Sequence, residues 1–345
     1  MPADRLTPEE VGERLSAFLQ RHHGSRSVSI DGLRLLTGGA SRQTWSFDAA
    51  IEHADGRTET FTLVARADPR KGPNVMSRDI EYRVLEAAGA AGVPVPRVHA
   101  MGDDSLGVPF FLMERVEGET IARRILRDDE YASARAGMTS QLGRILAAIH
   151  ATPVEGLPLQ EPEPGLTAAE TEVQRFEQTY RMITPDPHPA FELAFRWLKE
   201  NLPAPTEPGF VHGDYRMGNL IVGPDGIRSV LDWELAHIGD PLEDFGFLCI
   251  RSWRFGSDDK PVAGVGQREE LWTAYEAAGG NPVDPKAAHW WEVFGNLRWG
   301  IMTIMQANAY LTGMSKSVEL ASIGRRTAET EWELLNLLEE GDHAG

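Results

Sequence analysis

The chain has 345 residues, and its 34 Lys+Arg against 52 Asp+Glu give a formal net charge of −18. Hydrophobic residues make up 41% and charged residues 25%, a globular composition that excludes intrinsic disorder as the general description. The length predicts about two domains, or one enzyme fold with two lobes. An acidic chain repels nucleic acid and anionic membranes, so we expect neither as a partner.

The compartment is indicated by the cysteine count and the N-terminal residues. The single cysteine, Cys249, allows no internal disulfide, which is typical of a reducing compartment. The start of the chain shows no signal peptide. The longest uncharged stretch, between Arg298 and Lys316, is too short and too polar for a membrane helix. We therefore expect a soluble cytoplasmic protein, and the residues do not indicate its oligomeric state.

The first 115 residues predict a small sheet with one packed helix and an additional helix at the N-terminus. Residues 7–10 (TPEE) are typical of a helix start with a capping box and predict a helix over 7–22. Short strands are predicted between residues 30 and 66. Apolar residues at helical spacing predict a helix over 77–89, and the dense apolar run at 110–116 predicts a buried strand.

After Gly118 the pattern becomes mainly helical. Pro-rich segments punctuate the helices as loops, at residues 153–164, 184–189 and 203–208. Two short β segments, 220–222 and 227–231, interrupt the helical pattern and are joined by the turn Pro224-Asp225-Gly226.

The segment 212–219, HGDYRMGN, carries the clearest chemical signal in the chain. Asp214 and Asn219 are five residues apart, and Asp232 follows at the end of the predicted strand pair. Phosphoryl transfer needs one carboxylate for the substrate hydroxyl, and an amide oxygen with a second carboxylate for Mg²⁺. The alternative is a turn that is rich in Asp, Asn and Gly for conformational reasons alone. The context of strand, loop and hairpin favours the site, with Asp214 catalytic and Asn219 and Asp232 binding the metal.

These motifs also resemble a known family. HGDYRMGN followed by VLDWE is similar to the catalytic and metal-binding motifs of the aminoglycoside phosphotransferase-like kinases, which are relatives of protein kinases. Further similar segments lie within residues 28–335: LTGGASRQTW, EYRVLEAAGAAGVPVPRV, PFFLMERVEGE and HIGDPLEDFGFLCIRSWRFG. The extended forms DWELAHIGDPLEDFG and RWGIMTIMQANAYLTG resemble the branch that includes the kinase-like domain fused to some acyl-CoA dehydrogenases.

The resemblance implies an α+β, two-lobed protein-kinase-like fold. Residues 1–115 would form a small antiparallel-sheet N-terminal lobe that binds the nucleotide, with the helix at 7–22 as an extension. Residues 116–345 would form the larger, mainly helical C-terminal lobe that carries catalysis and acceptor binding. ATP and Mg²⁺ are the implied cofactors, and a small-molecule hydroxyl is the implied acceptor.

The resemblance assigns roles to individual positions. Asp214 aligns with the catalytic base, and Asn219 and Asp232 align with the metal ligands. The remaining nucleotide-binding positions are the loop over the phosphates, a cation with its helix carboxylate, and the hinge strand that grips adenine: Gly38, Gly39, Ala40, Ser41, Arg66, Glu81, Glu114 and Val116. From the residues alone, Gly38–Ser41 is an ordinary turn, Glu81 an exposed helix charge and the hinge a buried strand.

One position departs from the usual kinase pattern. Kinases of this kind usually carry lysine on the third strand, whereas this chain has Arg66, and Lys71 lies five residues further on. The branch commonly has arginine here, and arginine can bind phosphate in a bidentate way. We expect Arg66 to replace the lysine, with Lys71 as the second choice.

Several other polar or aromatic positions are expected to be structural. His212 and His150 are interpreted as packing or backbone-bonded histidines. Asp240 and Asp244 are expected to brace the loop. The tryptophans Trp253, Trp290, Trp291 and Trp299 are expected in the core. One or two of them are expected to line an acceptor pocket built by the helices after Trp253, including residues 290–310.

Three function classes compete. The first is a kinase for the hydroxyl of a small molecule, either a hydroxy acid or hydroxyacyl thioester, or an aminoglycoside. The second is a nucleotide-binding pseudokinase, against which the retained Asp214, Asn219 and Asp232 argue. The third is a hydrolase, for which the chain lacks a Gly-x-Ser-x-Gly motif.

Overall fold

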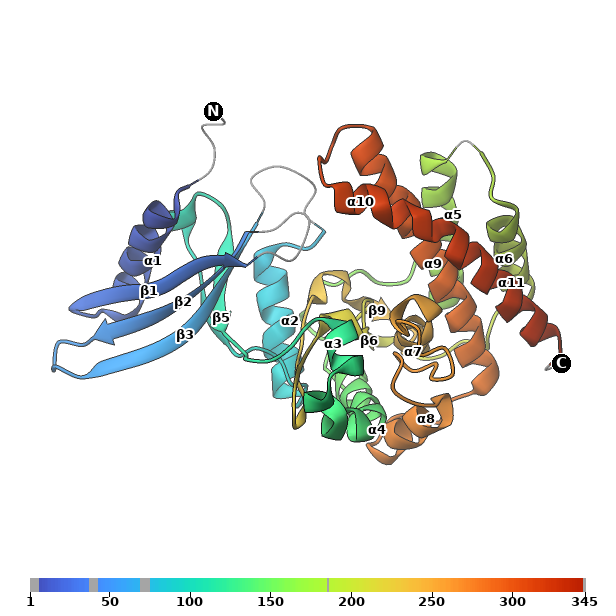
Figure 1. Cartoon of the computed structure of the whole chain (residues 1–345), viewed down its shortest axis with the longest axis horizontal. Coiled ribbons are helices and arrows are strands. Elements are labelled where there is room, and N and C mark those ends of the chain that lie inside the picture. Colours follow the sequence, from blue (N-terminus) through green and yellow to red (C-terminus); the bar gives the residue numbers. More distant parts are fainter. Residues whose placement is uncertain (1–5, 37–42, 69–74, 185, 344–345) are drawn as a thin grey trace. The chain divides into compact units, whose positions relative to one another are not determined.

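The structure is a computed structural model that describes residues 6–36, 43–68, 75–184 and 186–343. The chain divides into two compact units (Figure 1). The N-terminal unit comprises residues 1–90 and 95–117, and the C-terminal unit comprises residues 91–94 and 118–345. The expected α+β class with an antiparallel N-terminal sheet and a larger helical part is confirmed.

An antiparallel sheet of five strands, in the order β1-β2-β3-β5-β4, organises the N-terminal unit. The strands are β1 (Ser27–Leu36), β2 (Gln43–Glu52), β3 (Thr58–Ala67), β4 (Val98–Met101) and β5 (Phe110–Glu114). Because β5 lies between β3 and β4, its first four residues are buried, which explains the continuous apolar run there.

Two helices accompany the sheet. Helix α1 (Pro8–His23) begins with the predicted capping box, in which the Thr7 hydroxyl accepts from the Glu10 N–H and the Glu10 carboxylate accepts from the Thr7 N–H. Helix α2 (Arg78–Ala90) buries Val84, Leu85 and Ala88 on one face, as its spacing predicts.

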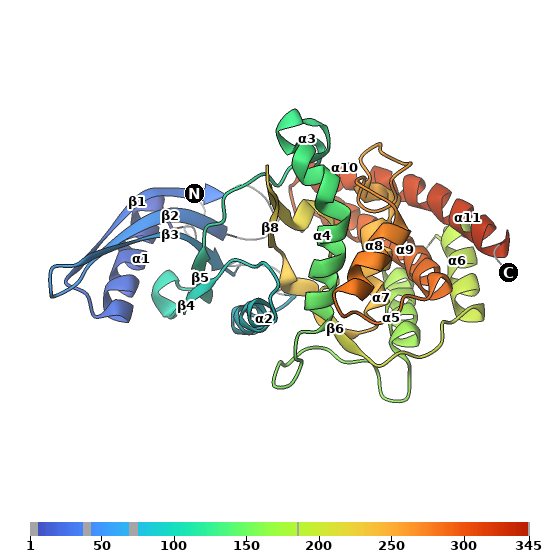
Figure 2. The same cartoon turned by 90° about the horizontal axis from the view of Figure 1, so that it is seen from below.

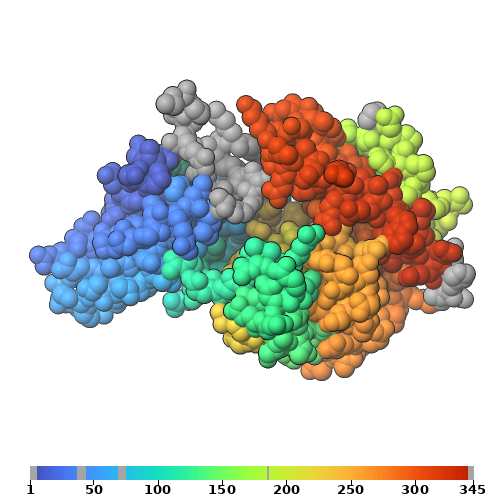
Figure 3. Space-filling model, in the orientation of Figure 1, coloured from blue at the N-terminus to red at the C-terminus, as the bar shows by residue number. Residues whose placement is uncertain are grey.

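Helices dominate the C-terminal unit. They are α3 (Ala122–Arg127), α4 (Ala132–His150), α5 (Ala168–Ile183), α6 (Pro189–Glu200), α7 (Leu242–Cys249), α8 (Arg268–Ala277), α9 (Pro285–Leu311), α10 (Val318–Ile323) and α11 (Thr327–His343). Figures 1 and 2 show α4 alongside α8, and α9 running through the unit between its other helices. In the space-filling view, α10 and α11 form part of the surface of this unit (Figure 3). Within the described residues, no helix combines the length and hydrophobicity that a bilayer crossing requires.

Helix α9 is the central buried element of this unit. Trp290, Trp291 and Trp299 on α9 are at most 7% exposed, and Trp253 is 4% exposed, so the expectation that these tryptophans are core residues is confirmed. Helix α7 crosses α9 closely at Gly246, where an added Cβ would lie 2.3 Å from the Trp291 backbone. A larger side chain at this crossing would therefore separate the two helices.

Two short ribbons lie among these helices and position the candidate site. Strand β6 (Gly209–Val211) pairs with β9 (His237–Gly239), and β7 (Leu220–Gly223) pairs with β8 (Gly226–Val230) in the predicted hairpin. Both pairs are antiparallel.

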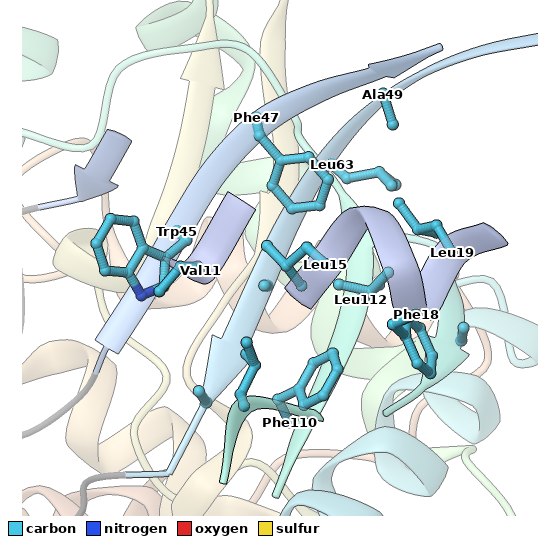
Figure 4. Close-up of a cluster of buried hydrophobic side chains, with 14 residues drawn as sticks. Val11, Leu15, Phe18, Leu19, Trp45, Phe47, Ala49, Leu63, Phe110 and Leu112 are labelled. Carbon is cyan, nitrogen blue, oxygen red and sulfur yellow. The ribbon is translucent and has the colours of Figure 1, made fainter. Parts of the chain in front are cut away.

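The main described core of the N-terminal unit lies between α1 and the sheet (Figure 4). Val11, Leu15 and Leu19 on α1 contact a cluster that includes Phe47 and Leu112, and all five are at most 1% exposed. Burying a side chain of this size completely stabilises the fold by roughly 1.5–3 kcal/mol. Helix α1 is therefore an integral part of the N-terminal unit, because its apolar face packs against the sheet.

Candidate active site

The loop between β6 and β7 presents Asp214 in a fixed orientation. Its Oδ1 accepts a hydrogen bond from Arg216 Nε at 2.9 Å, and its Oδ2 accepts one from Asn219 Nδ2 at 2.6 Å. The Asp214 side chain is 16% exposed, so solvent still reaches it. The carboxylate thus stands at the protein surface with both oxygens oriented by neighbours from the same loop.

Asn219 is held so that its amide oxygen is available. Its Nδ2 donates to the Asp214 backbone oxygen at 2.9 Å as well as to the carboxylate, and Asn219 itself is 2% exposed. In the described part of the chain, no donor contacts the Asn219 Oδ1. A carbonyl-type oxygen of this kind is a ligand that Mg²⁺ accepts.

The hairpin brings Asp232 next to Asn219. Leu220 pairs with Val230, and the Leu231 N–H donates to the Asn219 backbone oxygen at 2.8 Å. Asp232 therefore directly follows a residue that is hydrogen-bonded to Asn219. Asp232 adopts a left-handed conformation, with φ 61° and ψ 61°. Non-glycine residues in this region are uncommon and cluster at functional sites.

The donor set suits magnesium bound together with a nucleotide. Among the described residues there is no group of three or more His, Cys, Asp or Glu that could hold a metal ion alone. Magnesium in phosphoryl-transfer sites typically takes one or two protein ligands and completes its octahedron with phosphate and water oxygens. The oxygens of Asn219 and Asp232 fit that requirement.

His212 is a structural residue, as expected from the sequence. Its Nδ1 accepts the Asp214 N–H at 3.1 Å, and its Nε2 donates to the Leu231 backbone oxygen at 3.0 Å. Both contacts require the neutral ring, and burial lowers the pKa of His212 despite the nearby carboxylates of Asp244 and Asp214. The ring joins the loop that carries Asp214 to the end of the hairpin that carries Asp232.

Asp244 on α7 holds the loop between β6 and β7 in place, which confirms its expected role. Its two carboxylate oxygens accept the N–H groups of His212 and Gly213, each at 2.9 Å, and it contacts His150 Nε2 at 3.3 Å. Burial alone would raise its pKa, but the hydrogen bond and charge of His150 outweigh burial and lower the pKa of Asp244. His150 is therefore a buried partner of Asp244 at the end of α4. Asp240 plays a smaller part, because its Oδ1 accepts the Leu242 N–H at the start of α7.

A second buried network holds the same loop through its carbonyl. Arg298 on α9 donates to the Gly213 backbone oxygen at 2.8 Å and pairs with Glu243 at 2.6 Å. Glu243 also contacts His237 Nε2 at 3.1 Å. Burial opposes the charge of His237, but Glu243 raises the pKa of His237 to about 9.

The N-terminal unit contains the implied ion pair between strand and helix. Arg66 on β3 contacts Glu81 on α2 at 2.6 Å between Nε and Oε1. Glu81 is 2% exposed, so the interpretation of it as an exposed helix charge was wrong, and the pairing implied by the resemblance is present. Arg78, fully buried on α2, also pairs with Glu81 and contacts Asp68 at 2.7 Å.

The other expected nucleotide positions divide into two groups. Gly38, Gly39, Ala40, Ser41 and the second-choice Lys71 lie outside the described residues. Glu114 ends β5, and its N–H donates to the Arg97 oxygen at 2.8 Å. Among the described residues, the backbone N–H and C=O of Val116 have no backbone hydrogen-bond partner, which leaves them available to a ligand.

Sequence reasoning missed three arginines of these networks: Arg78, Arg216 and Arg298. Arg216 could have been found, because it lies inside HGDYRMGN two residues after Asp214. Arg78 and Arg298 lie on helices in stretches where charge is ordinarily exposed, and only tertiary packing buries them.

Comparison with known proteins identifies the family. A family model described as "Phosphotransferase enzyme family" matches residues 32–280 of the 345 residues. The chain belongs to this phosphotransferase family. The resemblance seen in the sequence motifs is thereby confirmed.

Individual relatives show which branch of the family this phosphotransferase is similar to. It is 29% identical over 279 residues to acyl-CoA dehydrogenase family member 10 of Mus musculus, covering 76% of this chain and 26% of the relative. The chain spans between 23% and 45% of the length of the acyl-CoA dehydrogenase family members 10 and 11 that it matches. It therefore corresponds to one part of those longer proteins.

Solved structures show the same fold for the phosphotransferase. A candidate aminoglycoside phosphotransferase of Ralstonia eutropha superposes with a TM-score of 0.69 at 24% identity, covering 96% of this chain and 98% of the other. A thermostable mutant of the aminoglycoside phosphotransferase APH(4)-Ia, in a ternary complex with AMP-PNP and hygromycin B, gives a TM-score of 0.60 at 16% identity. That match covers 94% of this chain and 98% of the other. The expected two-lobed, protein-kinase-like fold is confirmed by these matches.

Proposed function

We propose that this phosphotransferase moves the γ-phosphoryl group of ATP, with Mg²⁺, to a hydroxyl of a small molecule. The observation that carries the proposal is the contact between Asp214 and Asn219 beside the hairpin end that bears Asp232. These are the oxygen-bearing groups that phosphoryl transfer requires, and in this chain they come from one loop and one hairpin of one unit.

Asp214 is the proposed catalytic base. Its carboxylate accepts the proton of the acceptor hydroxyl while the hydroxyl oxygen forms a bond to the γ-phosphorus and the bond to the ADP oxygen breaks. The Arg216 guanidinium, 2.9 Å from Asp214 Oδ1, fixes the carboxylate and places positive charge beside the reacting groups. Asn219 Oδ1 and the Asp232 carboxylate would hold Mg²⁺, which neutralises charge on the phosphates when bound.

Nucleotide binding is proposed for the N-terminal unit. Arg66 would contact the phosphates, with Glu81 fixing its position, and Gly38–Ser41 would cover them. Glu114 and Val116 would form the hinge, where the available backbone groups of Val116 suit the edge of adenine. The ternary complex of APH(4)-Ia with AMP-PNP supports an ATP-type nucleotide in this fold.

The acceptor is proposed to be a hydroxy acid or a hydroxyacyl thioester. The support is the similarity to one part of acyl-CoA dehydrogenase family member 10, whose name indicates acyl thioester chemistry. An aminoglycoside is the second candidate, because the structural relative APH(4)-Ia holds hygromycin B. A nucleotide-binding pseudokinase is the alternative from another class, and the retained Asp214, Asn219 and Asp232 argue against it.

The deciding experiment compares the wild-type chain with Asp214→Asn for phosphoryl transfer to a panel of hydroxy acids, acyl-CoA esters and aminoglycosides. ADP release should fall by about 10²–10⁴-fold in the variant, while the dissociation constant of ATP stays within a few-fold. Asp225→Asn is the matched control, because Asp225 lies in the same unit at an exposed turn and pairs only with Arg228 on the described surface. Undiminished turnover in Asp214→Asn would refute the role of Asp214. ATP binding without turnover of any acceptor would favour the pseudokinase.

A further inference from the structure

Four of the ten histidines of the chain come together in the N-terminal unit. They are His22 and His23 at the end of α1, His53 directly after β2, and His99 on β4. The ring centroid of His23 lies 5.0 Å from that of His22, 6.4 Å from that of His53 and 5.3 Å from that of His99. Figure 2 labels α1 and β4, the two elements whose histidines meet most closely. The proposed phosphotransfer uses none of the four.

His23 and His99 are at the distance from each other that two ligands of one metal ion require. Their Nε2 atoms are 3.1 Å apart. Histidine binds metals through a ring nitrogen, and a Zn–N bond is about 2.0–2.1 Å long. Two nitrogens on one such ion are therefore about 2.8–3.4 Å apart, from the octahedral to the tetrahedral angle. The observed separation lies within this range.

Both rings are neutral at neutral pH, which is the form that binds a metal. Burial lowers the pKa of His23 and of His99, and neighbouring histidines lower both pKa values further. Glu59 acts in the opposite direction on His23, whereas Arg97 adds to the lowering at His99. In the contact between the two rings, one Nε2 donates and the other accepts. The donating ring frees its Nε2 for a metal when its proton moves to Nδ1.

The surroundings of the pair favour a positive charge. His23 is the last residue of α1, and the C-terminal end of a helix carries a partial negative charge. The Nε2 of the neighbouring His53 is buried and makes no hydrogen bond with any described residue, although Glu59 Oε2 lies 3.4 Å away. Buried polar atoms are ordinarily satisfied, and water held by a bound ion is one source of a partner.

The pair supplies two protein ligands, so water has to complete the coordination of an ion bound there. In the part of the chain that the structure describes, no three His, Cys, Asp or Glu residues are grouped so as to hold a metal ion. Imidazole nitrogens suit Zn²⁺, Ni²⁺ and Cu²⁺, whereas Mg²⁺ prefers oxygen ligands. The pair therefore differs in chemistry from the oxygen ligands of Asn219 and Asp232.

We propose that His23 and His99 form a binding site for a divalent transition-metal ion of the Zn²⁺ class, with water as the remaining ligands. The ion links the C-terminal end of α1 to β4. Because the two ligands come from distant parts of the sequence and meet only in the folded chain, the bound ion stabilises the N-terminal unit. Metal binding at this pair is independent of the proposed phosphotransfer.

Calorimetric titration of the full chain with Zn²⁺ tests the site. Excess Mg²⁺ is present throughout, because it binds oxygen ligands and leaves imidazole free. His23→Asn and His99→Asn each remove one ligand, so each should weaken Zn²⁺ binding about tenfold or more. His289→Asn is the matched control, because His289 is also half-buried but lies on α9 with its Nε2 3.1 Å from the Leu337 backbone oxygen. The control should keep the affinity of wild type.

Two further measurements keep the test valid if a substitution weakens the fold. Zn²⁺ should raise the urea midpoint of wild type and of His289→Asn but not that of His23→Asn or His99→Asn, each protein being compared with itself without Zn²⁺. Electron paramagnetic resonance of the wild-type chain loaded with one Cu²⁺ should show two imidazole nitrogens on the ion. Absence of Zn²⁺ binding, equal Zn²⁺ affinity in wild type and in His23→Asn or His99→Asn, or a Cu²⁺ spectrum without nitrogen ligands would overturn the proposal. The four rings would then form a hydrogen-bonded aromatic cluster only.

Discussion

The two units hold their functional residues in different ways. In the N-terminal unit, Arg66 is fixed by a side chain, Glu81, which Arg78 holds in turn. In the C-terminal unit, the loop that carries Asp214 is fixed through its backbone: Asp244 accepts two N–H groups and Arg298 donates to a carbonyl oxygen. The first arrangement fixes the position of a charged side chain, and the second fixes the backbone conformation of a loop.

This difference explains which substitutions each unit can accept. A side-chain pair between Glu81 and a cation on β3 is satisfied by arginine as well as by lysine, since both carry the charge. The backbone contacts of Asp244 need a carboxylate with two acceptor oxygens at that position, and neither a longer nor a neutral side chain reproduces them. We therefore expect variation at residue 66 to be tolerated better than variation at residue 244.

The largest effect should come from Asp244→Ala. The change leaves two loop N–H groups and His150 without their buried acceptor, so the free energy of unfolding should fall by about 3–5 kcal/mol and turnover should be lost. Urea unfolding and ADP release measure the two losses. Asp225→Ala is the control, because its carboxylate is 71% exposed and should cost less than about 1 kcal/mol. A loss below about 1 kcal/mol in Asp244→Ala would show that the loop does not depend on this brace.

The next effect is a pH dependence confined to the C-terminal network. Glu243 raises the pKa of His237 to about 9 in the folded chain, against about 6.5 when unfolded, so charged His237 stabilises the fold fully below pH 6.5. That stabilisation, about 3 kcal/mol at most, is lost as the pH rises through 9. Urea unfolding should therefore show a gap between wild type and His237→Gln that is large at pH 6 and small at pH 10. A gap that is independent of pH would contradict the charged state of His237.

The N-terminal cluster should respond in nucleotide affinity. Arg66→Ala removes the proposed phosphate contact and should weaken ATP binding about tenfold or more, which titration calorimetry measures. Lys71→Ala is the comparison, because Lys71 is the other candidate cation. Loss of affinity in Lys71→Ala alone would overturn the assignment to Arg66.

Local patterns predicted much of this structure. The capping box of α1 could be identified because its residues, Thr7 and Glu10, are three apart, and the loop of Asp214 and Asn219 could be identified from one eight-residue motif. The branch resemblance also predicted the pair of Arg66 with Glu81, which the residues alone did not.

The remaining features depend on contacts between distant segments. Arg78 and Arg298 look like ordinary helix charges, and their burial follows only from the packing of whole elements. A cavity of about 800 Å³ in the C-terminal unit is lined by residues of α3, of the segment 251–258 and of α11, and more than a hundred residues separate α3 from the other two in the sequence. The acceptor pocket expected from the helices after Trp253 stays a prediction; Asn296 of residues 290–310 and several residues of α11 line this cavity. The spacing of residues along the sequence does not predict contacts between segments that lie so far apart in it.

The central claim is that Asn219 and Asp232 hold a divalent cation against the nucleotide phosphates. The most direct test is an ATP titration of wild type and Asp232→Ala, each with and without Mg²⁺, followed by calorimetry. We predict that Mg²⁺ tightens ATP binding at least tenfold in wild type and leaves it unchanged in Asp232→Ala, because the variant lacks the proposed metal ligand. An equal response to Mg²⁺ in the two proteins would contradict the account.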